Sequence, residues 1–174
     1  MSIDQDLDIA VSSASPLVPA GTGRHLMDGP LGAVLLAGGS ATGGAASFVI
    51  HPLAPRALGS PVHTHSREDE WTYVLAGQVG VQVGDRVVLA APGDLVLKPR
   101  EVPHAFWNAT DEPARMLEVI TPGGFETYFE ELGEILAADE PDLGRLGELA
   151  ERHAVRMDLA SVPRLASEHD LRMG

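Results

Sequence analysis

Short apolar runs separated by turn residues fill the chain from about residue 31 to residue 121. Glycine, proline, asparagine or aspartate interrupts the runs at short intervals, and no stretch between them has the length or spacing of a helix. Eight or so short strands at this spacing predict an all-β sandwich or barrel. The runs are Ala33–Leu36, Ala46–Ile50, Glu70–Leu75, Val79–Val83, Arg86–Leu89, Leu95–Leu97, His104–Ala109 and Met116–Thr121.

The pattern changes after Pro122-Gly123-Gly124. Apolar residues then recur at steps of three and four, which is typical of one face of a helix. The first stripe comprises Phe125, Tyr128, Phe129, Leu132, Ile135 and Leu136, and a second, over about 142–157, comprises Leu143, Leu146, Ala150, Ala154 and Met157. We expect both helices to cap the β core, and the aromatic face of the first has a second interpretation, as the closure of a pocket mouth.

These patterns divide the 174 residues into three parts. Residues 1–25, acidic and then rich in serine, proline and glycine, are predicted to form a flexible arm. Residues 26–122 form the β domain, and residues 123–174 form a helical segment packed on it. The length fits one domain with a modest tail.

Charge and cysteine content exclude several classes of function. The net charge is −13, so the chain should repel nucleic acids and anionic membranes. There is no cysteine, which excludes disulfides, thiolate catalysis and sulfur ligands to a metal. The N-terminus lacks the basic and apolar regions of a secretory signal, and no apolar stretch is long enough to span a membrane. We therefore expect a cytoplasmic protein.

Three of the seven histidines lie in a pattern that suits metal binding. His63 and His65 are two apart, so in a strand both imidazoles point to the same face. Glu70 opens the next strand after a short polar turn, and His104 begins a later one. Three imidazoles and a carboxylate converging inside a barrel form a nitrogen and oxygen ligand set for Zn, Fe(II), Mn, Co, Ni or Cu.

Other residues compete for this role. Glu68 and Asp69 are alternative carboxylates, which we expect in an exposed turn, with Asp69 on the opposite side of the strand from Glu70. The remaining histidines lack such partners and are interpreted as surface or packing residues; they are His25, His51, His153 and His169.

Two motifs resemble those of the cupin superfamily. Gly59 to Gly77, with His63-Thr64-His65 and Glu70, resembles the first cupin motif, and Gly93 to Asn108, with Pro99 and His104, resembles the second. The resemblance covers about residues 30–136 and is closest to bacterial single-domain cupins similar to quercetin 2,3-dioxygenase. It implies a cupin-type jelly-roll β-barrel. Two positions depart from the family pattern, because Glu101 and Ala57 stand where glycines are expected.

The resemblance also implies a chemistry. His63, His65, Glu70 and His104 would hold one divalent transition metal, and Glu70 would also act as the catalytic proton acceptor. The implied reaction is cleavage of a planar aromatic or enol substrate by O2. A non-redox isomerase, cyclase or lyase and a non-catalytic small-molecule binder are the alternatives, because one fold hosts many functions.

Candidate pocket residues follow from strand alternation and from the first helix. Thr72 and Val74 share the inward face of Glu70, and Thr72 occupies a position that is usually aromatic in quercetinase-like cupins. Phe106 and Asn108 share the face of His104. The full candidate set is Phe48, Thr72, Val74, Phe106, Asn108, Phe125, Tyr128 and Phe129.

The outward face of the predicted strand Glu70–Leu75 predicts self-association. Trp71, Tyr73 and Leu75 would point away from the site, and an apolar outer sheet face needs a cover. Cupins of the kind that this chain resembles commonly pair through their sheets. We therefore expect a homodimer.

Overall fold

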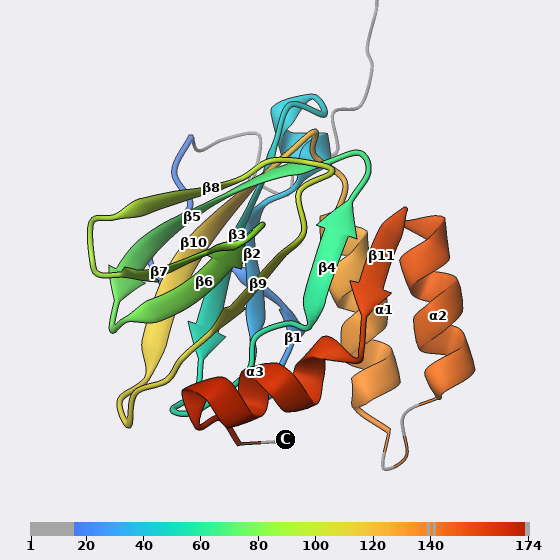
Figure 1. Cartoon of the computed structure of the whole chain (residues 1–174). Helices are drawn as coiled ribbons and strands as arrows, with labels where there is room; N and C mark the ends of the chain where they lie inside the picture. The colour runs from blue at the N-terminus through green and yellow to red at the C-terminus, as the bar shows by residue number, and fades with distance from the viewer. Residues whose placement is uncertain (1–15, 139, 141, 173–174) are drawn as a thin grey trace, which may run out of the picture.

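The computed structural model describes residues 16–138, 140 and 142–172, and most of the predicted 1–25 arm lies outside them. Two antiparallel sheets face each other (Figure 1). The six-stranded sheet has the order β1-β2-β3-β10-β5-β8, and the five-stranded sheet has the order β11-β4-β9-β6-β7. The all-β prediction is confirmed.

The long strands of the six-stranded sheet alternate buried and more exposed side chains, which is the period expected of a sheet that covers a core on one face. In β10, for example, Ala114, Met116, Glu118 and Ile120 are buried while their neighbours are not. The strands are β1 Arg24–Met27, β2 Ala33–Ala37, β3 Ser47–Leu53, β4 Val62–His65, β5 Asp69–Ala76, β6 Val79–Val83, β7 Arg86–Ala90, β8 Leu95–Lys98, β9 His104–Trp107, β10 Ala114–Thr121 and β11 Val155–Asp158.

The helices lie beside β4 and β11, while β7 and β8 lie on the other side of the molecule (Figure 1). They are α1 Glu126–Leu136, α2 Leu143–Arg152 and α3 Ser161–His169, with one short 3-10 turn, η1 Gly39–Thr42. Helix α1 packs the predicted aromatic stripe against β1, β2 and β3 in one core cluster. The prediction of a helix over this stripe is confirmed.

Three boundaries differ from the sequence predictions. The second helix ends at Arg152, because Ala154 adopts a left-handed conformation (φ 54°) that an α-helix does not contain. Residues 155–158 then form β11 and pair with β4, so the C-terminal segment is not wholly helical. At the other end, Arg24 and His25 belong to β1, so the predicted arm is too long by two residues.

The two departures from the cupin motifs have local solutions. Glu101 keeps the left-handed backbone (φ 62°) that favours glycine, and its N–H donates to the His65 carbonyl at 2.8 Å. Gly59 lies under the Phe106 ring, where a Cβ atom would come within 2.1 Å of that ring. The glycine near Ala57 therefore allows a close contact with strand β9.

Among the described residues, no helix combines the length and apolar character needed to cross a bilayer.

Candidate metal centre

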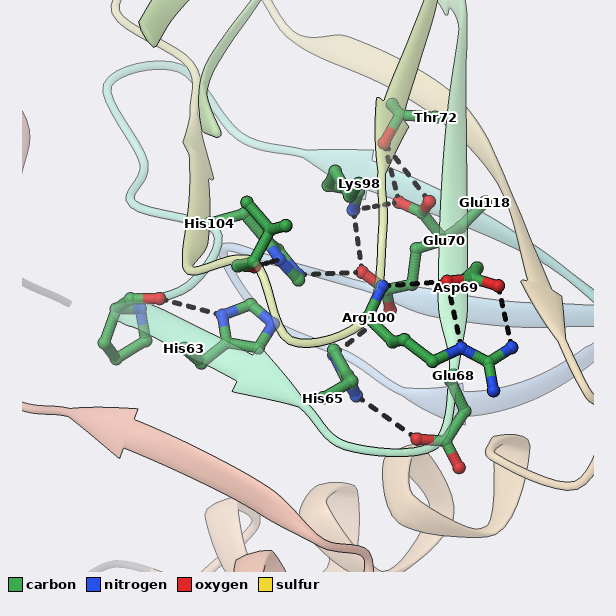
Figure 2. Close-up of polar contacts among 12 residues, drawn as sticks. His63, His65, Glu68, Asp69, Glu70, Thr72, Lys98, Arg100, His104 and Glu118 are labelled. Atoms are coloured by element: carbon green, nitrogen blue, oxygen red, sulfur yellow. Dashed lines mark hydrogen bonds and ion pairs between the residues drawn. The ribbon is translucent and has the colours of Figure 1, made fainter. Parts of the chain in front are cut away.

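The four predicted ligands meet between the two sheets. His63 and His65 come from β4, His104 from β9 and Glu70 from β5. One potential ligand atom from each residue lies within 4.8 Å of all the others, and all four residues are buried (Figure 2). The period of two in β4 places both its histidines inward, and His63 pairs directly with His104 across the sheet.

Backbone carbonyls fix the tautomers of two imidazoles. His63 Nδ1 donates to the Pro61 carbonyl and His104 Nδ1 donates to the Val102 carbonyl, each at 2.9 Å. A neutral imidazole that donates through Nδ1 keeps its lone pair on Nε2. Both Nε2 atoms are therefore available as ligands.

Burial keeps His63 in the neutral form that binds metals. Loss of solvation, together with the neighbouring His104, lowers the pKa of His63 to about 3. A metal ligand must be deprotonated, so no proton competes for His63 at neutral pH.

Glu70 is held as a carboxylate. Burial alone would raise its pKa, but Lys98, His65 and His104 outweigh burial and hold the pKa of Glu70 well below its usual range. Its Oε1 lies 3.5 Å from His65 Nε2, and its Oε2 lies 3.1 Å from His104 Nε2 and 2.9 Å from Lys98 Nζ. The site therefore holds an anionic carboxylate beside three imidazoles.

A metal ion fits the polar atoms of this cluster. Both ring nitrogens of His65 are buried without a hydrogen-bond partner among the described residues. His104 Nε2, whose ring already donates through Nδ1, faces the acceptor oxygen Glu70 Oε2. A cation among these atoms would satisfy all of them, and the nitrogen and oxygen donors suit a divalent transition metal.

The sequence predicted Glu68 in an exposed turn, but its side chain is buried. The loop after β4 folds its side chain inward, where it is buried with Oε2 3.6 Å from His65 Nδ1. At this distance the Glu68 carboxylate faces the imidazole without a hydrogen bond. Asp69, in contrast, points away from the cluster as predicted and binds Arg100 at 2.7 Å.

The predicted pocket residues separate into three groups. Thr72, Val74 and Phe106 are buried on the inner face: Thr72 contacts Glu118, Phe106 lies beneath Lys98 Nζ, and Val74 shares a core cluster with Phe106. The residues around α1 pack into a core cluster that reaches the site, with the ring centroid of Phe125 4.7 Å from that of His65 and the ring centroid of Phe129 4.9 Å from that of His51. Tyr128 stacks on Phe125 in that cluster.

Two of the predicted pocket residues do not lie toward the site. Phe48 alternates with the inward residues Ser47 and Val49, so it lies on the outer face of β3. Asn108 uses its amide to donate to the carbonyls of Leu53, Ala54 and Glu112, which ties three loop segments together. These contacts do not bring either residue to the cluster, and their role in a substrate pocket stays a prediction.

Sequence reasoning missed a buried pair behind Glu70. Lys98 and Glu118 lie 2.8 Å apart and are 1% and 2% exposed at the side chain. Burial raises the pKa of Glu118 to about 7, and Glu118 accepts hydrogen bonds from Thr72. Each charge stands in an otherwise apolar run, at an inward position, and that pattern was the available signal.

The other four histidines stay outside the cluster, as predicted. His25 is exposed, His153 packs against Phe125, and His169 stacks on Trp107 with ring centroids 4.0 Å apart. His51 is buried and donates from Nδ1 to the Gly32 carbonyl at 2.7 Å.

Replacement of His51 with asparagine should reduce the acid sensitivity of the fold. Burial lowers the pKa of His51 from 6.5 to about 4, so between these values only the unfolded chain takes up the proton. The contribution of the neutral His51 to the free energy of unfolding is complete above pH 6.5. It is lost as the pH falls toward 4, by about 1.4 kcal/mol per pH unit. Urea unfolding measures the free energy of unfolding at about pH 7 and about pH 5. The decrease between these pH values should be about 2 kcal/mol smaller in His51→Asn than in the wild type, and the asparagine amide can still donate to Gly32.

The matched control is His25→Asn, at an exposed histidine, which should keep the pH dependence of the wild type. An equal loss of stability in His51→Asn and the wild type would contradict the assigned protonation state.

Comparisons with known proteins place this geometry in a family. Residues 49–120 match the family model described as a cupin domain, and this segment contains all four cluster residues. This segment is therefore similar to a cupin domain, and the two facing sheets have the cupin fold.

Solved structures show the same fold at low sequence identity. A sugar phosphate isomerase from a cupin superfamily, from Silicibacter pomeroyi, is 24% identical over 61% of this chain and 75% of its own, with a TM-score of 0.54. A predicted oxalate decarboxylase from Thermotoga maritima is 20% identical over 60% and 96%, with a TM-score of 0.54. The Lactobacillus farciminis oxalate decarboxylase formate complex is 21% identical over 59% and 32%, with a TM-score of 0.52. No curated protein matches the chain.

Proposed function

We propose that the protein is a single-metal cupin dioxygenase that cleaves a planar aromatic or enol substrate with O2. The observation that carries the proposal is the buried cluster of His63, His65, Glu70 and His104, with three imidazoles and one carboxylate. When bound, the metal would supply Lewis acidity, and redox chemistry if it is Fe, Mn, Co, Ni or Cu. Aromatic side chains beside the cluster, such as Phe125, suit a planar apolar substrate.

Glu70 is the residue that would move the substrate proton. It is buried and ionised, and its two oxygens face different partners, so one can accept a proton from an enol or phenol while the other stays in place. The three histidines would hold the metal and not exchange protons, because their Nδ1 atoms face carbonyls or Glu68. The division of roles within the cluster supports a proton-abstracting enzyme.

Oxygen uptake tests the proposal. Chelator-treated protein reloaded separately with Fe(II), Mn, Co, Ni and Cu should consume O2 with flavonols, and anaerobic samples should leave the substrate unchanged. His104→Ala, treated in the same way, is the control for metal in solution. If no loaded form consumes O2, the dioxygenase proposal fails, and full occupancy by Zn without O2 uptake would instead favour a non-redox isomerase, cyclase or lyase.

The outer face of the six-stranded sheet supports a homodimer as a second proposal. Tyr73 pairs with Leu95 and Trp71 with Leu97 across β5 and β8, and Tyr73, Leu95 and Leu97 are 41–57% exposed. These two cross-strand pairs carry no charge. They can therefore meet the same pairs of a second copy across a two-fold axis without burying an unpaired ion. Sedimentation at micromolar concentration should give twice the chain mass of 18.3 kDa, and a monomer would contradict the proposal.

A further inference from the structure

A chain of buried polar groups continues from the metal cluster into the six-stranded sheet (Figure 2). Lys98 Nζ donates to Glu118 Oε2 at 2.8 Å and lies 2.9 Å from Glu70 Oε2. Thr72 Oγ1 donates to Glu118, 2.9 Å from Oε2 and 3.2 Å from Oε1. The order Thr72–Glu118–Lys98–Glu70 links a ligand to residues that themselves lie outside the cluster.

The sheet register holds this chain in place. Lys98 in β8 lies directly opposite Glu70 in β5, and Glu118 in β10 lies directly opposite Thr72 in the same strand β5. Thr72 is buried in β5, and its hydroxyl is committed to Glu118.

Such a pair is not explained by stability alone. Burying an ammonium and a carboxylate costs desolvation energy, and apolar residues of similar volume often stabilise a protein equally well. The ammonium also does more than neutralise Glu118, because it divides its contacts between two carboxylates. A role in orienting Glu70 accounts for that division.

We propose that Lys98, anchored by Glu118 and Thr72, is a positioning residue for the metal centre, which binds Glu70 Oε2 and presents Oε1 as the ligand oxygen. The inference rests on the proposed metal centre. Oε1 is the oxygen that lies nearer to His65, at 3.5 Å from Nε2. A carboxylate fixed at one oxygen loses the freedom to rotate, so the ligand set is preorganised.

The competing explanation is charge compensation, in which Lys98 only neutralises nearby carboxylates. The two explanations differ for a double variant, Lys98→Met with Glu118→Gln. This change removes the ammonium and its carboxylate partner together, so neither member of the pair is left without the other. Compensation predicts an unaltered metal centre, whereas positioning predicts an altered one.

The test uses Co²⁺ as the probe, because its visible absorption bands depend on the number and arrangement of the ligands. In the double variant we expect changed bands and a 10–100-fold weaker affinity in a chelator competition, the range typical for loss of an outer partner of a metal ligand. The matched control is Asp69→Asn with Arg100→Met, which removes a more exposed ion pair between β5 and the turn after β8 and should leave the spectrum as in the wild type. Glu118→Gln alone keeps Lys98 beside Glu70 and should also preserve the bands.

The proposal is overturned if the Co²⁺ spectrum of the double variant superimposes on that of the wild type. This holds even if the variant is less stable. Should the double variant not fold, Lys98→Gln with Glu118→Gln keeps polar groups that can bind each other and serves in the same comparison. A wild-type protein that binds no Co²⁺ would instead refute the metal centre itself, so the two failures are distinguishable.

Discussion

Replacement of His104 with alanine is expected to weaken Co²⁺ binding by more than the 10–100-fold that loss of an outer partner typically costs. His104 supplies one of three imidazoles, and its Nδ1 donation to Val102 aims Nε2 at the cluster. The remaining His63, His65 and Glu70 would leave the ion with three protein ligands and an open side. Isothermal titration of chelator-treated protein measures the loss.

The control for this prediction is His25→Ala, at a histidine that is exposed and remote from the cluster, which should bind Co²⁺ as the wild type does. His63→Ala should behave like His104→Ala, because the two residues pair across β4 and β9. Stoichiometric, tight binding retained in both alanine variants would contradict the assignment of the ligands.

Replacement of Lys98 with methionine is expected to lower the free energy of unfolding of the metal-free protein by about 3–5 kcal/mol. The variant leaves Glu70 and Glu118 buried on the inner face without their shared cation, which is the cost of an uncompensated buried charge. A typical domain is stable by about 5–15 kcal/mol, so the loss would be a large part of the total. Urea unfolding in the presence of a chelator gives the value.

The double variant with Glu118→Gln controls for this effect. It removes one of the two carboxylates left unpaired, and it should recover more than half of the lost stability. A loss below about 1 kcal/mol in Lys98→Met alone would show that the two carboxylates share a proton or reach water, contrary to the buried ion pair described above.

Strand periodicity in the sequence was enough to predict most of the fold and the candidate ligands. The spacing of His63 and His65 places both on one face by geometry alone, and the apolar runs mark the strands that surround them. Glu70 and His104 could be assigned because each lies at the start of a predicted strand after a turn. These are local features, and local features are what a single sequence displays.

The features that were missed depend on which strands become neighbours. Lys98 and Glu118 are 20 residues apart, and they meet because β8 and β10 both flank β5. Residues 155–158 continue an apolar stripe compatible with a helix, but pairing with β4 makes them a strand. The side of Phe48 could not be predicted because the run Ala46–Ile50 has apolar residues on both faces, so its alternation does not show which face is inward.

Metal analysis of the purified protein tests the central claim most directly. Protein prepared without chelators, or reloaded with Zn, Mn, Fe(II), Co, Ni or Cu and then desalted, should retain about one equivalent of a divalent transition metal per chain. The His63→Ala and His104→Ala proteins, treated identically, should retain almost none. Wild-type protein that retains none of these metals would contradict the account.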